Sequence, residues 1–278
     1  MEIVLRANRG WLNLDLKELW QYRDLVSLMV RRDFVAKYSQ TILGPLWFIV
    51  QPVLTTVVFT VVFGKIAGLS TDGLPPLLFY LGGQLGWAYF SQSFTTNSAT
   101  LINNSALFGK VYFPRLVVPL SVLISNLFAF AIQFGTFIAF YAYFKIAEPA
   151  GAFGFDWRVV LLPFLVLQTA LLSLGVGLLM SSLTAKYRDL NHVSTLLIQL
   201  WMYATPVIMP LSSFPPKWQW AVVLNPMTAI VESFRLMLLG RGTVEPLHLA
   251  YSVSATLVIC LAGLILFHKV ERTFIDTV

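Results

Sequence analysis

Charged residues are scarce in this sequence. Asp, Glu, Lys and Arg make up 12% of its 278 residues, about half the share typical of soluble proteins. Hydrophobic residues make up 57%, and the mean hydropathy is +0.75. A soluble chain of this length could not bury so much apolar surface, and a disordered chain would not carry it. The composition therefore indicates an integral membrane protein.

Cysteine and histidine are also rare. Cys260 is the one cysteine, so the chain forms no intramolecular disulfide and no cysteine-ligated zinc site. The three histidines, His192, His248 and His268, are too far apart in sequence to show ligand spacing. We expect neither a bound metal nor a nucleic-acid partner.

A nucleotide-binding loop is missing as well. Gly109-Lys110 is followed by Val111 and lacks the upstream glycine of a P-loop, so this chain should not bind ATP in that way. No paired carboxylates or histidine clusters share a membrane depth, which argues against a membrane enzyme and leaves no catalytic candidates. The predicted spans described next contain no Asp, Glu, Lys or Arg, whereas ion-coupled carriers usually keep such groups near the midplane.

Six long stretches free of charged residues are present. A helix needs about 20 apolar residues to cross about 30 Å of hydrocarbon, and each stretch is long enough. The sequence thus predicts an all-α integral membrane protein with six spans, at residues 45–64, 77–98, 117–143, 159–183, 192–210 and 250–268.

A seventh stretch, residues 218–231, is too short to cross the bilayer. Because prolines surround it, we predict a re-entrant helical hairpin at residues 211–241, between spans five and six on the extracytoplasmic side. Glu232 and Arg235 stand three residues apart and would pair in a helix. We expect that pair to be exposed and to contribute about 0–1 kcal/mol.

Lysine and arginine predict the orientation. With a cytoplasmic N-terminus, about twice as many of them flank the spans on the inside as on the outside. Both termini are therefore expected in the cytoplasm, as an even number of spans requires.

The chain reads as one domain with cytoplasmic ends. Residues 1–43 form an N-terminal segment whose residues 14–37 predict an amphipathic helix at the membrane interface, where a simple surface anchor is the plainer alternative. Residues 44–270 form the transmembrane domain, and residues 271–278 a tail. The loop at 101–115 predicts a short helix ending near Gly109 or, alternatively, a plain connector.

Aromatic residues are plentiful, with 22 Phe, 10 Tyr and 8 Trp. Most should form interfacial belts or face lipid. A minority on the first and fifth spans are candidates to line a path for sugars, because ring faces suit carbohydrate C–H groups. These channel-lining candidates are Trp47, Phe48, Phe59, Phe63, Trp201 and Tyr203.

Several motifs together resemble one family. The run from Tyr38 to Pro52, with Leu43-Gly44-Pro45-Leu46-Trp47 inside it, is similar to the start of the first span in permeases of ATP-binding-cassette exporters for polysaccharides, lipid-linked O-antigens and teichoic acids. Further matches are Phe108–Arg115, Tyr187–Leu190, Leu224–Met227 followed by Arg235, and Lys269–Phe274. Many members have Arg where this chain has Lys37, which keeps the charge but loses bidentate phosphate geometry.

The resemblance implies a homodimer that works with two copies of a separate ATPase subunit, which binds ATP and magnesium. It implies a multi-pass protein of the bacterial inner membrane, in contact with membrane lipids. It also makes the 101–115 loop the coupling element that docks on the ATPase. The residues expected to do so are Asn104, Phe108, Lys110, Tyr112 and Phe113, with the three aromatics as an apolar anchor.

A lipid-linked substrate with a pyrophosphate needs positive charge and backbone donors at the cytoplasmic mouth of the first span. The candidates for this headgroup site are Arg31, Arg32, Lys37, Tyr38, Leu43 and Gly44. The alternative is that the cations only satisfy the positive-inside rule and that Gly44-Pro45 only begins a helix. The candidates for an extracytoplasmic exit gate are Pro215, Pro216, Asn225, Pro226, Glu232 and Arg235.

The first hypothesis is the permease subunit of an ATP-driven exporter for a polyprenyl-pyrophosphate-linked O-antigen type polysaccharide. The same family exporting a teichoic acid, a capsule or a small amphiphile is the main alternative. A carrier or channel independent of ATP is a third possibility from another class.

Overall fold

The structure is a computed structural model that describes residues 16–38, 42–111, 113–147, 153–187 and 189–274. These residues contain helices and connecting segments but no strand, so the prediction of an all-α protein is confirmed. The helices, in chain order, are α1 (Leu16–Gln21), α2 (Arg23–Tyr38), η1 (Gly44–Leu46), α3 (Trp47–Phe59), η2 (Thr60–Ile66), α4 (Pro76–Ser98), α5 (Thr100–Asn103), α6 (Ser105–Phe108), α7 (Val117–Ala147), η3 (Trp157–Leu161), α8 (Leu162–Lys186), α9 (Leu190–Tyr203), η4 (Leu211–Ser213), α10 (Pro216–Val223), α11 (Pro226–Leu239) and α12 (Pro246–Phe274).

Four described helical segments are long and apolar enough to cross a membrane. They are Gly44–Ile66, Val117–Ala147, Trp157–Lys186 and Pro246–Glu271, and they coincide with predicted spans one, three, four and six. A fifth candidate is the pair α10 and α11, which is bent by 100°. α4 is 23 residues long, which is sufficient length to cross, but it carries many uncharged polar side chains. The count of six spans therefore stays a prediction.

The predicted fifth span, residues 192–210, is wrong in its length. α9 has 14 residues and ends at Tyr203, which gives it a length of about 21 Å. Pro206 and Pro210 follow closely, and a proline disfavours helical geometry at the residue before it. The chain then turns through residues 204–210 instead of continuing as a helix.

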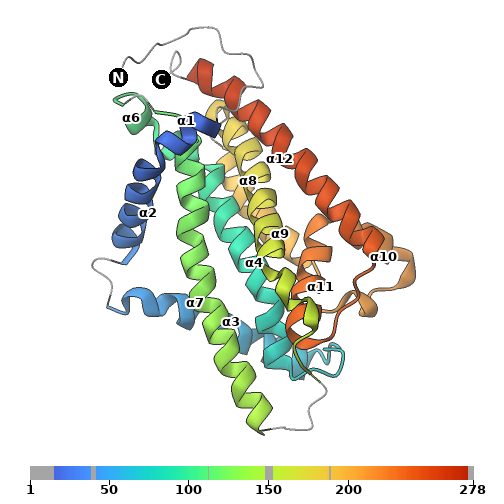
Figure 1. Cartoon of the computed structure of the whole chain (residues 1–278). Helices are drawn as coiled ribbons and strands as arrows, with labels where there is room; N and C mark the ends of the chain where they lie inside the picture. Colours follow the sequence, from blue (N-terminus) through green and yellow to red (C-terminus); the bar gives the residue numbers. More distant parts are fainter. Residues whose placement is uncertain (1–15, 39–41, 112, 148–152, 188, 275–278) are drawn as a thin grey trace.

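α7, α4, α8 and α12 form the frame of the molecule. α4 packs on both α7 and α8, and α12 packs along α8. Figure 1 shows these long helices running roughly together, whereas α3 runs across their direction. α3 is exposed along most of its length, unlike the other long helices. α2 packs beside α7, so the predicted N-terminal helix is present, while its position at a membrane interface stays a prediction.

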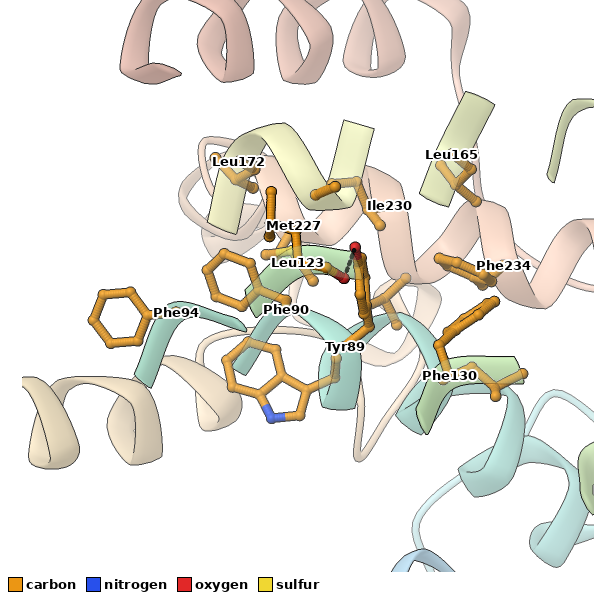
Figure 2. Packing of buried hydrophobic residues seen from close by; sticks show 14 of the residues in the cluster. Tyr89, Phe90, Phe94, Leu123, Phe130, Leu165, Leu172, Met227, Ile230 and Phe234 are labelled. Carbon is orange, nitrogen blue, oxygen red and sulfur yellow. Dashed lines mark hydrogen bonds between the residues drawn. The ribbon is translucent and has the colours of Figure 1, made fainter. Parts of the chain in front are cut away.

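The core lies where α11 packs against α4. Gly86 makes room for this contact, because a Cβ there would lie 2.7 Å from the Phe234 ring. Tyr89 bridges to α7 by donating its hydroxyl to the carbonyl oxygen of Leu123 at 3.3 Å. Figure 2 shows this packing from α4 (Tyr89, Phe90, Phe94), α7 (Leu123, Phe130), α8 (Leu165, Leu172) and α11 (Met227, Ile230, Phe234).

Connections predicted for the two membrane sides lie at opposite ends of this frame. Ser212 Oγ donates to Asp72 Oδ1 at 3.0 Å, which joins two segments predicted to be extracytoplasmic. At the other end, Thr184 Oγ1 donates to the carbonyl oxygen of Ser98 at 2.8 Å. This grouping agrees with the predicted order of crossings. Which end faces the cytoplasm stays a prediction.

Candidate functional site

A cavity of about 510 Å³ lies between α3, α4 and α7, with α9 at one side. Its size is typical of small-molecule sites. The described residues that line it include no Asp, Glu, Lys or Arg. They are Trp47, Phe48, Gln51, Pro52, Thr55, Phe59, Gln84, Trp87, Ala88, Tyr89, Ser91, Gln92, Asn126, Ala129, Phe130, Gln133 and Met202.

The wall of this cavity combines amides and aromatic rings. Gln84 is 8% exposed, and its Nε2 has no hydrogen-bond partner among the described residues. A buried amide without a partner costs free energy unless a ligand or water satisfies it. Side-chain amides both donate and accept hydrogen bonds, and ring faces attract C–H groups. The wall is therefore suited to a neutral molecule that carries many hydroxyl groups.

A second cavity of about 450 Å³ adjoins the first, because Phe48, Gln92 and Asn126 line both. It extends between α4 and α7 toward α2 and the loop after α4. Most of its remaining lining side chains are small or polar: Arg32, Asp33, Phe34, Ala36, Thr96, Thr100, Asn103, Asn104, Val118, Val122 and Ser125. The two cavities together form a track from α2 to the middle of α4, and most of the polar side chains that line it are uncharged.

Three of the six channel-lining candidates line the first cavity, namely Trp47, Phe48 and Phe59. The other three do not line either cavity. Phe63 packs edge-on against Phe59 with ring centroids 5.4 Å apart. Trp201 donates its Nε1 hydrogen to Asn225 Oδ1 at 2.9 Å, and Tyr203 is exposed.

Sequence reasoning missed the uncharged polar residues of the cavity. Gln84, Gln92 and Asn126 lie in predicted spans two and three, where a search for charged groups passes over them. The sequence did offer a signal for these residues, namely side-chain amides within otherwise apolar helices. A buried amide needs a hydrogen-bond partner, so its presence there indicates a polar contact or a cavity. In the described part of the chain, no group of three or more His, Cys, Asp or Glu is placed to hold a metal ion.

The headgroup candidates lie on both sides of the α2–α3 connection. Arg32 lines the second cavity and donates to Asp33 Oδ1 at 2.7 Å, which partly neutralises it, while Arg31 is exposed. Gly44 has φ +50°, a left-handed conformation that glycine adopts readily, and it begins η1 after an exposed Leu43. The side chains of the remaining two candidates, Lys37 and Tyr38, fall outside the described residues.

The 101–115 loop has the predicted short helix, since α6 ends at Phe108 and Gly109 caps it. The expectation of an exposed apolar anchor needs correction. Phe108 and Phe113 are 7% and 5% exposed and contact each other, with ring centroids 5.8 Å apart. They pack the loop onto the helix frame, because burying two rings there removes apolar surface from water.

The rest of the loop gives a different outward surface. Asn104 is half-buried and donates its Nδ2 hydrogen to the Thr100 carbonyl oxygen at 2.9 Å. Lys110 and Val111 are exposed. Tyr112 lies outside the described residues. The exposed surface of the described loop therefore includes Lys110 and Val111, together with Asn103, Ala106 and Gly109, and not the two phenylalanines.

The region predicted as a re-entrant hairpin contains α10 and α11, joined by a sharp bend at Asn225. That this pair re-enters the membrane stays a prediction, and the name hairpin is kept for residues 211–241. Pro215 precedes α10, and Pro216 and Pro226 begin the two helices, as suits proline at a first helical position. Asn225 Oδ1 accepts a hydrogen bond from the N–H of Met227 at 3.0 Å and so caps α11.

The Glu232–Arg235 pair forms as predicted, but the expectation that it is exposed is wrong. Both side chains are 1% exposed. Arg235 also donates its Nη2 hydrogen to the Val207 carbonyl oxygen at 2.7 Å. Glu232 accepts hydrogen bonds from the N–H groups of Leu211 and Thr243 at 3.2 and 2.9 Å. Helix packing around α11 buries this pair, and its contacts hold α11 to the segments on either side of it.

Comparison with known proteins agrees with this architecture. The family described as ABC-2 type transporter matches residues 24–239. An O-antigen export system permease protein, RfbA, of Myxococcus xanthus is 29% identical over 246 residues, covering 87% of this chain and 91% of the relative. The RfbA protein of Klebsiella pneumoniae is 23% identical over 276 residues, covering 99% of both chains. The polysialic acid transport protein KpsM of Escherichia coli is 23% identical over 256 residues, covering 91% of this chain and 95% of the relative. This chain belongs to the ABC-2 type transporter family.

Proposed function

We propose that this chain is the permease subunit of an ATP-driven exporter that moves a polyprenyl-pyrophosphate-linked polysaccharide of the O-antigen type out of the cytoplasm. The observation that carries the proposal is the mostly uncharged, amide and aromatic track formed by the two adjoining cavities. Such a wall offers hydrogen bonds and ring faces to successive sugars without holding any one of them tightly. The O-antigen export relatives, similar over nearly the whole chain, support this cargo.

Capsule export is the second candidate, because relatives named for polysialic acid transport and capsule polysaccharide export are also similar. A teichoic acid or a small amphiphile remains an alternative cargo without a relative here to favour it. An ATP-independent carrier or channel is disfavoured by membership of the transporter family.

The proposed assembly is a homodimer with two copies of a separate ATPase subunit, which binds ATP and magnesium. The absence of a P-loop from this sequence supports a separate ATPase. The exposed side of the 101–115 loop, with Lys110 and Val111, is the proposed docking surface. The protein would lie in the bacterial inner membrane with both termini in the cytoplasm.

The cargo would begin its path at the cytoplasmic side and leave at the opposite end. Arg32 lines the second cavity, Arg31 precedes it on α2, and Gly44 begins η1. A pyrophosphate headgroup needs such cations and free N–H groups. The hairpin at residues 211–241 lies at the other end and would form the exit gate.

Copurification of the chain with its ATPase, followed by mass spectrometry of bound lipid, tests this proposal. A polyprenyl pyrophosphate glycan bound to the complex is the expected result, and Val111→Asp should reduce ATPase recovery. A capsule polymer in its place would favour the second candidate. A chain that exports glycan without any ATPase would overturn the proposal.

A further inference from the structure

α12 extends from one end of the helix frame to the other. It has 29 residues, so its length is about 44 Å. Figure 1 shows it along one side of the molecule, passing α8 and reaching the region of α10 and α11. Its two ends contact the two parts of the protein to which the proposed function gives moving roles, the 101–115 loop and the hairpin.

One end of α12 holds the loop through Arg115. This arginine is 6% exposed, and its Nη1 donates to the main-chain oxygen of Glu271. Its Nε also lies 3.8 Å from Glu271 Oε1, and its guanidinium lies 5.5 Å from the centre of the Phe108 ring. His268 Nδ1 lies 3.2 Å from Glu271 Oε2 and so fixes the same carboxylate. The last turns of α12 therefore hold the end of the loop in place.

The other end of α12 holds the bend of the hairpin. Ser252 Oγ donates to the Pro226 carbonyl oxygen at 2.7 Å, and Tyr251 donates its hydroxyl to the Leu224 carbonyl oxygen at 3.1 Å. Gln168 of α8 donates its Nε2 hydrogen to Ser252 Oγ at 2.9 Å. Leu224 and Pro226 flank the break at which α10 and α11 bend by 100°. Two hydrogen bonds thus attach α12 directly to the bend.

Between these ends, α12 is in close backbone contact with α8. A Cβ added at Gly263 would lie 2.4 Å from the main-chain oxygen of Gly175, and one added at Gly175 would lie 2.6 Å from the Cα of Cys260. Glycine on both helices permits such close packing. The middle of α12 is therefore packed tightly against α8.

We propose that α12 is a rigid link that carries displacement of the 101–115 loop to the hairpin bend at residues 224–226. Arg115 and Glu271 are positioning residues at one end, and Tyr251 and Ser252 are positioning residues at the other. The inference rests on the proposed roles of the loop in ATPase docking and of the hairpin as a gate. The path is contiguous, and interrupting it in the middle tests whether it transmits motion.

The test kinks α12 at a position whose side chain faces away from the rest of the described protein. Val258 is 65% exposed, so Val258→Pro breaks a main-chain hydrogen bond of the helix without removing a buried side chain, and Val258→Ala is the matched control. If the proline variant does not fold, a second variant replaces it. This variant carries Val258→Gly and Leu261→Gly, and its control carries alanine at both positions. Each variant is combined with Cys260→Ala and with Lys217→Cys, which carries a fluorophore on α10. The complex with the ATPase is then reconstituted in liposomes.

We expect every variant to copurify with the ATPase and to hydrolyse ATP. In the alanine controls, ATP should change the fluorescence of the α10 label as in the wild type. In the proline or double-glycine variant, that change and glycan export should both fall on the order of tenfold, within the usual range of coupling between sites. Glu271→Gln should reduce the same two readouts, and Glu271→Asp should restore them in part.

A full fluorescence change and full export in both kinked variants would overturn the link while leaving the proposed function standing. No response of the α10 label to ATP in the wild-type complex would instead overturn the gate role of the hairpin, and the link with it.

Discussion

The Nη1 atom of Arg235 donates a hydrogen bond to Oε1 of Glu232 at 2.8 Å, inside α11 and away from solvent. The guanidinium also lies 3.9 Å from the centre of the Phe79 ring on α4. A charge removed from water needs every available partner, because its desolvation costs several kcal/mol. The pair and its main-chain contacts therefore anchor α11 in the helix frame, whereas α10 has no buried residue.

Arg235→Gln should lower the free energy of unfolding by about 3–5 kcal/mol, because it leaves the Glu232 carboxylate buried without its cation. The matched control is Arg158→Gln. Arg158 pairs with Asp156 on the surface, with 46% of its side chain exposed, and such pairs contribute about 0–1 kcal/mol. Unfolding in detergent measures both, and equal losses would contradict the central role of the buried pair.

Gly175→Ala should destabilise the α8–α12 contact by about 1–3 kcal/mol, because the new methyl group would overlap the α12 backbone. Gly135→Ala on α7 is the control, since nothing lies within 4 Å of a Cβ there. That substitution should be neutral or stabilise the helix by about 0.5–1 kcal/mol. Thermal unfolding of the two purified variants decides the matter, and similar melting temperatures would argue against the close helix contact.

Gln84→Met should slow glycan export about fivefold, because it keeps the volume of the side chain and removes hydrogen bonds of about 1 kcal/mol. The Gln84 amide lines the first cavity, and within the described part of the chain its nitrogen has no hydrogen-bond partner. Thr136→Val is the control, since the Thr136 hydroxyl bonds within its own helix outside both cavities. Export rates are compared at equal protein level. An unaffected Gln84→Met variant would remove this amide from the path.

Single cysteines at Thr71 and Ser212, in a Cys260→Ala background, should react with an impermeant thiol reagent added outside the inner membrane. Cysteines at Asn104 and Asp189 should stay unlabelled. The expectation combines the lysine and arginine distribution with the 3.0 Å contact between Ser212 and Asp72, which places two of the connections together. Labelling at Asn104 from outside would reverse the orientation. A third predicted outside position, Gly151, lies outside the described residues.

Local sequence was sufficient for the helical fold and for several of its boundaries. Long runs of residues without charged side chains correctly predicted four of the apolar helices. Backbone N–H and C=O groups in hydrocarbon must form hydrogen bonds within their own segment, which favours a helix. Gly44-Pro45 marked a helix beginning, since the backbone preferences of these two residues act without help from distant residues. The same reasoning failed for α9, where two downstream prolines outweighed a continuous apolar run.

Only the tertiary structure decided which polar side chains are buried and which groups they pair with. Glu232 and Arg235 look like a surface pair in sequence, and only the packing of α4 and of the segments around Val207 and Thr243 against α11 removes them from water. Arg115 meets Glu271 across 156 positions, and the cavity amides come from different helices. Helical periodicity reports which residues share a face, but solvent exposure and hydrogen-bond partners depend on which other helices cover that face, and those contacts form between residues far apart in the chain.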